Sequence, residues 1–329
     1  MQENEISVQG KVLRDLIART SNDHLIGKKI KNGELRKQIS EVEPPWKCPD
    51  CFILKEIELE NFHMELLESR EDPNTDKIIL QLHGGGYVGP MRNAYRMFAG
   101  LYNEVSQGMS VLTIDYRVAP EHPYPAALED ACAAYQWLLD EGWFSDQIIL
   151  VGDSAGGGLA LALCHLLMDQ GKQLPCGIVA MSPWTDLTAS GESYETNYER
   201  DPLFGKTRDS MIYNNQVYVG DHDPMDAYIS PLFGDFRGFP PMLIQVGSYE
   251  MLLSDSVEVA AKARQQGVKV RLSIYEGMFH IFQMAAKMLP ESRKAWVEIG
   301  RFIAILTNDR HLSHEFHLGE AEPDQEDME

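Results

Sequence analysis

The stretch IILVGDSAGGG, residues 148–158, places one serine in a cluster of glycines directly after an apolar run. The run Ile148-Ile149-Leu150 predicts a buried β-strand. Residues 152–156 then fit the pattern G-x-S-x-G, which requires a strand before it and a helix after it. The small residues allow so sharp a turn that the hydroxyl of Ser154 stands clear at its tip. Ser154 is therefore the candidate nucleophile.

Similar apolar runs recur on both sides of this stretch. Helix-like segments separate most of them, such as PAALEDACAAYQWLLDEG at 125–142, where apolar residues recur at helical spacing. Continuous apolar strands separated by helices predict an α/β fold with a mostly parallel sheet and helices on both of its faces. The predicted strands are KIILQL (77–82), SVLTIDY (110–116), QIILVG (147–152), GIVAMS (177–182), MLIQVG (242–247) and VRLSIY (270–275).

The domain organisation is expected to be one α/β domain, residues 51–312, with additions. Residues 1–50 are predicted to form a helical cap segment, in which Val12, Leu13, Leu16 and Ile17 make one apolar packing stripe. Residues 187–228 interrupt the strand–helix alternation and are expected to complete a cap over the carboxyl edge of the sheet. The acidic tail 313–329 is predicted to be disordered.

The composition narrows the classes of partner. Twenty-nine Lys and Arg against 50 Asp and Glu give a net charge of −21, which disfavours binding to nucleic acid and to anionic membranes. The start MQENEISVQG lacks a signal-peptide pattern, and five cysteines are an odd number, so a cytoplasmic location is expected. Cys48 and Cys51 have no second ligand pair nearby in sequence, so no metal site is predicted.

A second glycine cluster, LHGGGY at residues 82–87, follows the strand 77–82. Residues without side chains let backbone N–H groups approach an anion closely. The N–H groups of Gly85, Gly86 and Ala155 are therefore predicted to form an oxyanion hole, with His83 anchoring the loop through its hydrogen bonds. The alternative is that these glycines form only a flexible turn.

A serine nucleophile needs a histidine as base and a carboxylate as acid. In α/β folds that carry G-x-S-x-G, the acid follows the serine in the chain and the histidine follows the acid. His280 comes after the last predicted strand and is the candidate base. Glu250 and Asp255 both follow the strand 242–247. Glu250 is favoured because it comes first after the strand, and Asp255 is the alternative. His122, His165 and His222 are interpreted as structural.

Several motifs in one order resemble the bacterial hormone-sensitive-lipase-like esterases, also called family IV lipolytic enzymes. The resemblance covers residues 77–305 and rests on HGGGY, DYRVAPEHPYPAALED (115–130), GDSAGG, SPWTDLT (182–188), YISPLFGDFRGFPPMLIQVGS (228–248) and GMFHIF. It implies an α/β-hydrolase fold with a helical cap, and cofactor-independent hydrolysis of short-chain acyl esters. It also implies the roles given above for Ser154, His280, Gly85, Gly86 and Ala155.

The resemblance leaves some points open. Many members carry Asp-Pro-Leu where this chain has Glu250-Met251-Leu252, so this chain departs from the common pattern at the position of the acid. Hydrolysis of an amide or a lactone by the same residues is an alternative, because the same groups serve all these acyl compounds. A ligand-binding protein without catalysis is a further one. The family also implies a homodimer through the edge strand near VKVRLSIY (268–275).

Overall fold

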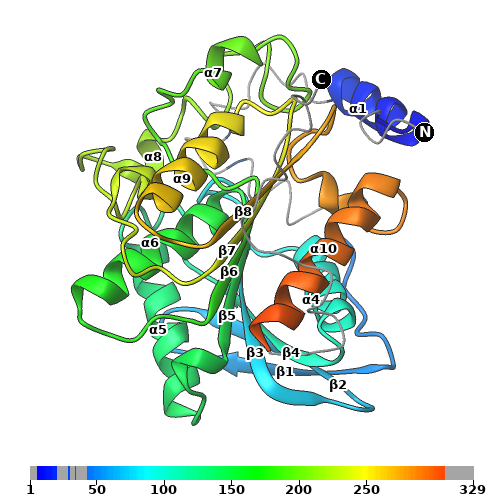
Figure 1. Cartoon of the computed structure of the whole chain (residues 1–329), viewed down its shortest axis with the longest axis vertical. Coiled ribbons are helices and arrows are strands. Elements are labelled where there is room, and N and C mark those ends of the chain that lie inside the picture. Colours follow the sequence, from blue (N-terminus) through cyan, green and yellow to red (C-terminus); the bar gives the residue numbers. More distant parts are fainter. Residues whose placement is uncertain (1–5, 21–28, 30–33, 35–42, 308–329) are drawn as a thin grey trace, which may run out of the picture.

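A computed structural model of the chain describes residues 6–20, 29, 34 and 43–307. The predicted tail 313–329, and most of residues 21–42 of the predicted cap segment, lie outside the described residues. An eight-stranded sheet forms the centre of the described part, in the order β1-β2-β4-β3-β5-β6-β7-β8 (Figure 1). The strands are β1 (Phe52–Glu58), β2 (His63–Ser69), β3 (Asn74–Leu82), β4 (Met109–Asp115), β5 (Ile148–Asp153), β6 (Gly177–Met181), β7 (Met242–Gly247) and β8 (Val270–Tyr275).

The six strands β3 to β8 correspond to the six runs predicted from the sequence, and all of them are parallel. The hairpin of β1 and β2, antiparallel to each other and to β4, was not predicted. Charged residues interrupt it, as in FILKEIE at 52–58, and one side of β1 is exposed. The half-buried positions 52, 54 and 57 of β1 are only a weak signal, because its apolar and polar residues do not alternate strictly.

Helices cover both faces of the sheet (Figure 1). On one face α6 (Ala155–Asp169) lies between α5 (Ala126–Asp140) and α9 (Leu253–Gln265), and on the other lie α4 (Asn93–Val105) and α10 (Pro290–Leu306). Successive strand residues supply the two cores in turn: Ile148 and Leu150 pack on the α6 side, whereas Ile149 and Val151 pack on the α10 side. This double burial explains the continuous apolar runs.

The N-terminal segment is helical over α1 (Val8–Thr20), but residues 43–50 are not. The predicted stripe is split. Leu13 and Ile17 pack against the core around Met278, whereas Val12 and Leu16 are 63% and 55% exposed. The prediction of one packing stripe was therefore wrong for half of its members. The four residues span too wide an arc of the helix for one contact surface to bury them all.

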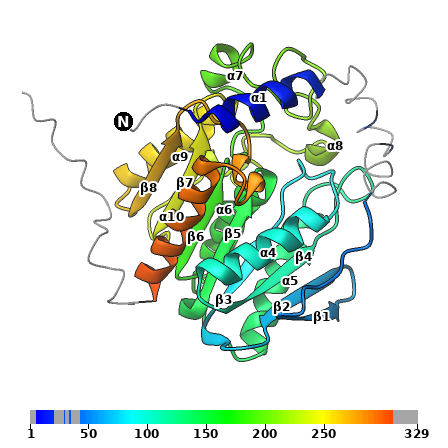
Figure 2. The same ribbon diagram turned by 90° about the vertical axis from the view of Figure 1, so that its right-hand side faces the viewer.

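The segment between β6 and β7 is the predicted interruption. It holds two short helices, α7 (Ser193–Thr196) and α8 (Gln216–Val219), and the 3₁₀ helix η2 (Pro231–Phe233) among irregular chain. Figure 2 shows α1 and α7 beyond the carboxyl ends of the strands. Both helices therefore lie on the side of the sheet where the candidate residues lie, and their role as a cap stays a prediction.

Candidate active site

Ser154 lies between β5 and α6 in a strained conformation, with φ 53° and ψ −122°. Its backbone is held on both sides, because Ser154 N donates to Met181 O and Ser154 O accepts from Trp184 N, each at 2.9 Å. The close approach of chains requires glycine at 156, since a Cβ there would collide with the carbonyl oxygens of Leu82 and His83. The turn therefore has the geometry that the sequence pattern requires.

His280 and Glu250 complete a continuous series of hydrogen bonds with this serine. The distance from Ser154 Oγ to His280 Nε2 is 2.9 Å, and that from His280 Nδ1 to Glu250 Oε2 is 2.8 Å. His280 lies between β8 and the 3₁₀ helix η3 (Phe282–Ala285), and Glu250 lies between β7 and α9. With its proton on Nδ1, His280 presents a free nitrogen to the hydroxyl, which is the arrangement of a general base.

The carboxyl group of Glu250 is fully buried and has further donors. Its Oε1 accepts from Ser182 Oγ at 2.7 Å and from the backbone N–H of Gly247 at 2.5 Å. Residues between β6 and β7 fix the loop around it: Asn197 donates to Glu250 O, and Asp201 accepts from Met251 N, both at 2.8 Å. Sequence reasoning missed these supporting residues. Ser182 could have been found, because it directly follows β6 at the same edge of the sheet.

The alternative acid, Asp255, has different partners. Its Oδ2 accepts from the N–H groups of Thr185 and Asp186, and its Oδ1 accepts from the hydroxyl of Tyr194 at 2.8 Å. Burial raises the pKa of Asp255 to about 8. Asp255 therefore ties the chain after β6 to the start of α9, and these hydrogen bonds do not include His280.

The glycine loop brings Gly85 and Gly86 into conformations that favour glycine, with φ 112° and 63°. Among the described residues, no protein acceptor takes the N–H of Gly85, Gly86 or Ala155. Ala155 is the first residue of α6, so its N–H also lies at the positive end of that helix. The three groups remain available to an anion.

His83 packs beneath the glycine loop and contacts its backbone. It is fully buried, its ring stacks on Tyr116 with centroids 4.1 Å apart, and its Nδ1 lies 2.7 Å from Gly84 O. Burial lowers the pKa of His83, which keeps the ring neutral. Next to it, Gly84 N donates to Asp153 Oδ1 at 3.1 Å, so the residue before the nucleophile also holds the loop. Sequence reasoning did not assign that contact to Asp153.

The other histidines lie away from this series. His165 is buried on α6, with Nε2 3.2 Å from Pro231 O, and burial lowers its pKa to about 4. His222 is exposed and packs edge-on against Tyr124.

The ring of Phe204, which lies between α7 and α8, packs against His280 with centroids 4.8 Å apart.

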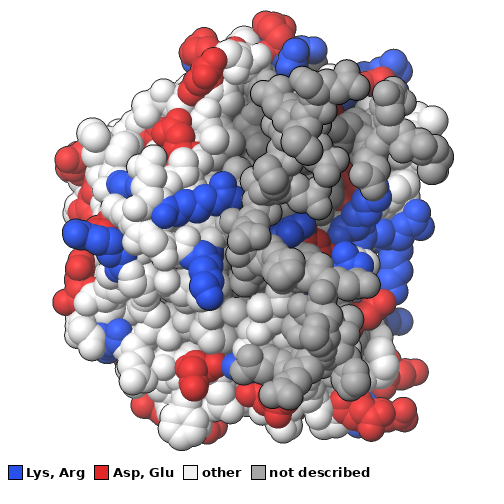
Figure 3. All heavy atoms as spheres, viewed as in Figure 1, with Lys and Arg blue, Asp and Glu red and all other residues white. Residues whose placement is uncertain are grey.

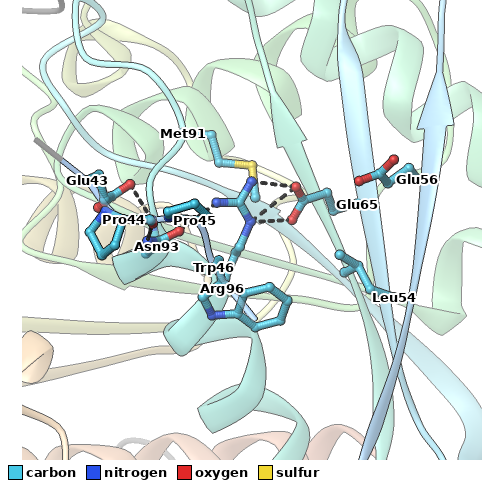
Figure 4. A pocket seen from close by; sticks show the side chains of 10 residues that line it. All are labelled: Glu43, Pro44, Pro45, Trp46, Leu54, Glu56, Glu65, Met91, Asn93 and Arg96. Atoms are coloured by element: carbon cyan, nitrogen blue, oxygen red, sulfur yellow. Dashed lines mark hydrogen bonds and ion pairs between the residues drawn. The ribbon is translucent and has the colours of Figure 1, made fainter. Parts of the chain in front are cut away.

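A cavity of about 370 Å³ lies elsewhere, between the β1–β2 hairpin and the start of α4 (Figure 4). The guanidinium of Arg96 crosses it to the buried carboxylate of Glu65, with Arg96 Nη2 and Glu65 Oε1 2.6 Å apart. Its lining contains none of the candidate catalytic residues. Within the described ranges, no group of three or more His, Cys, Asp or Glu side chains could hold a metal ion.

The surface charge and the length of the helices bear on binding to nucleic acid and to membranes. Figure 3 shows acidic and basic side chains interspersed on the face viewed, although the sequence as a whole is strongly acidic. No helix of the described part is long and apolar enough to cross a membrane.

Comparison with known proteins gives consistent matches. Residues 79–284 match a family model described as alpha/beta hydrolase fold. An esterase of Acinetobacter venetianus is 38% identical over 243 residues, covering 74% of this chain and 79% of the relative. An acetyl-hydrolase of Streptomyces hygroscopicus is 38% identical over 241 residues, covering 73% of this chain and 79% of that protein.

The crystal structure of an esterase from the bacterial hormone-sensitive lipase family is similar over most of the chain. Its TM-score is 0.80 at 32% sequence identity, covering 92% of this chain and 99% of the other. The similarity extends well beyond the strands and helices that carry the candidate residues.

Proposed function

Because this chain belongs to the bacterial hormone-sensitive-lipase family of esterases, with the α/β-hydrolase fold, we propose that it hydrolyses short-chain esters through Ser154, His280 and Glu250. The protein is an esterase. The catalytic roles of these three residues and the preference for short acyl chains are what we propose. The observation that carries it is the pair of short distances on His280, 2.9 Å to Ser154 Oγ and 2.8 Å to Glu250 Oε2.

The mechanism starts from the hydroxyl of Ser154. His280 takes its proton as Oγ attacks the ester carbonyl, and the N–H groups of Gly85, Gly86 and Ala155 stabilise the oxyanion. The resulting imidazolium lies against the carboxylate of Glu250, which stabilises its charge. His280 returns the proton to the departing alcohol. Water then attacks the acyl-serine ester in the same way and releases the carboxylic acid.

Two observations support a small, soluble ester as substrate. The protein from Streptomyces that resembles this chain is described as an acetyl-hydrolase. In addition, the segment between α7 and α8 lies close to the proposed reacting groups. Phe204 packs on His280, and the sulfur of Met211 would lie 2.6 Å from a Cβ added at Gly86. Large side chains therefore lie next to His280 and next to Gly86, and we expect them to disfavour a long acyl chain.

The test is hydrolysis of p-nitrophenyl esters from acetate to palmitate by the wild type and by Ser154→Ala, with and without EDTA. We expect activity that peaks at short chains, is unaffected by EDTA and falls by about 10⁶-fold without the serine, as in other serine hydrolases. Near-wild-type turnover by Ser154→Ala would exclude the mechanism. A peak at palmitate would exclude the short-chain preference alone.

A further inference from the structure

We propose that Ser182 is a positioning residue for catalysis, which holds the carboxylate of Glu250 in the orientation that serves His280. The inference rests on the proposed function, because it assigns Glu250 as the acid. Ser182 follows β6 directly, belongs to the motif SPWTDLT, and is fully buried. Its hydroxyl donates to Glu250 Oε1 over 2.7 Å.

The two oxygens of Glu250 have separate partners. Oε1 accepts from Ser182 Oγ and from Gly247 N, and Oε2 faces His280 Nδ1. A carboxylate rotates freely about its last side-chain bond unless its oxygens are held. Two donors on Oε1 fix the plane of the group, so that Oε2 is directed at the imidazole. The serine therefore acts on catalysis through the acid.

Ser182 also connects the acid to the segment that carries the base. The backbone N–H of Ile281, the residue after His280, lies 3.4 Å from Ser182 Oγ. Ser182 N donates to Gln245 O on β7 over 2.7 Å, which fixes the serine backbone to the strand that precedes Glu250. One buried hydroxyl thus lies between the two loops that supply the acid and the base.

The backbone of Ser182 adds an independent observation. Its φ is 45°, and Ser154 and Ser182 are the two serines with positive φ in the described ranges. Such conformations cost free energy outside glycine, and they are retained where the surroundings and the site require them. The turn at Ser182 directs its hydroxyl toward the loop after β7, where Glu250 lies.

The test compares Ser182→Ala with Ser256→Ala. Ser256 is equally buried, but within the described part of the chain its hydroxyl has no hydrogen-bond partner. Ser256→Ala is therefore a matched control, because it also removes a serine hydroxyl from a fully buried position. With p-nitrophenyl butyrate we expect kcat/KM to fall at least about ten-fold in Ser182→Ala, through kcat, and to stay unchanged in the control.

The pH profile is the readout that a purely structural role would not move. Loss of a donor to the ionised carboxylate makes the carboxylate–imidazole pair bind its proton more tightly. The acid limb of kcat/KM should therefore move to higher pH in Ser182→Ala and stay in place in Ser256→Ala. If Ser182→Ala folds poorly, Ser182→Gly removes the same hydroxyl and accepts the positive φ.

Labelling of Ser154 by a fluorophosphonate separates the two proposals. A wild type that is not labelled would overturn the proposed function together with this inference. A wild type that is labelled and active, beside Ser182→Ala or Ser182→Gly with unchanged kcat/KM and an unchanged acid limb, would overturn the role of Ser182 alone. Slower labelling of the Ser182 variants than of Ser256→Ala would support it.

Discussion

At the scale of single residues, two buried carboxyl groups near the same strand end have different tasks. Glu250 has one oxygen directed at His280, whereas the hydrogen bonds of the Asp255 carboxylate go to Thr185, Asp186 and Tyr194, between β6 and the end of α7. Position after the strand favoured Glu250 in the sequence, but only the contacts separate the two. The difference leads to opposite expectations for activity and stability.

Replacing each carboxyl group by its amide tests this difference. Glu250→Gln presents His280 with an amide that favours the wrong tautomer, and we expect kcat to fall by about 10⁴-fold, as for the comparable change in other triads. Asp255→Asn should keep most of its turnover and lose about 2 kcal/mol of unfolding free energy, because the amide NH2 group cannot accept the hydrogen bonds that one of the carboxyl oxygens accepts. Steady-state kinetics and urea unfolding of both variants would measure this. The reverse ranking in kcat would transfer the role of acid to Asp255.

At the scale of elements, the junction of β5 and α6 depends on close backbone packing. The helix can start directly under Ser154 because Gly156 lies against the carbonyl groups of Leu82 and His83 at the end of β3. Ser154 and the glycine loop are therefore brought together by two neighbouring parallel strands. The close packing at Gly156 therefore determines both the position of α6 and the position of Ser154 relative to the glycine loop.

A pair of glycine substitutions tests the packing of this junction. Gly156→Ala forces Cβ against backbone oxygens, and we expect a loss of about 3 kcal/mol of unfolding free energy together with loss of esterase activity. Gly100→Ala in α4 is the control, since a Cβ there meets Phe52 at 3.5 Å, an ordinary contact, and alanine favours a helix. Thermal unfolding and ester hydrolysis are the measurements. Equal stability of the two variants would contradict the packing explanation.

The contact of α6 with η2 predicts a dependence of stability on pH. Burial lowers the pKa of His165 to about 4, from an ordinary value near 6.5. The unfolded chain therefore binds more protons between these values, so the stabilisation is full above about pH 6.5 and is lost progressively as the pH falls toward 4. The loss amounts to about 3 kcal/mol at most.

Urea unfolding at pH 7 and pH 5 would measure this change. His165→Gln should flatten the pH dependence, because glutamine does not titrate and its amide can still donate to Pro231 O. The exposed His222→Gln should leave the dependence as in the wild type. An unchanged slope in His165→Gln would show that other groups govern acid unfolding.

At the scale of the whole molecule, the two edges of the sheet differ. One edge is β1 of the hairpin, and the other is β8, where Ile274 is 48% exposed. An unpaired edge strand offers its backbone groups to another chain. The homodimer expected from the family resemblance would use β8, and it remains a prediction for this chain.

Charge placed on each edge tests this prediction. Ile274→Lys should lower the molar mass measured by light scattering from that of a dimer to that of a monomer, because a lysine on an edge strand disfavours pairing. Ile53→Lys places the same charge on β1, where Ile53 is 37% exposed, and should leave the mass unchanged. A wild type with the mass of a monomer at the same concentration would refute the prediction.

The sequence by itself determined the parallel part of the sheet and the candidates for chemistry. Apolar runs buried on two faces are visible without coordinates, as is a serine between glycines after a strand, because both patterns follow from local backbone and burial requirements. The β1–β2 hairpin was missed because its half-exposed strands carry a weaker signal. The α1 stripe was predicted, but only two of its four residues are packed, because burial depends on contacts with residues that are distant in sequence.

Only the tertiary structure decided which polar groups meet. His280 lies 126 positions after Ser154, and Ser182 lies 68 positions before Glu250, yet both pairs are within hydrogen-bond distance. The choice between Glu250 and Asp255 as partner of His280 depends on side-chain direction, which the order of residues does not specify. Folding brings the carboxyl ends of β5, β6, β7 and β8 to one edge, and the packing of the loops there fixes each contact.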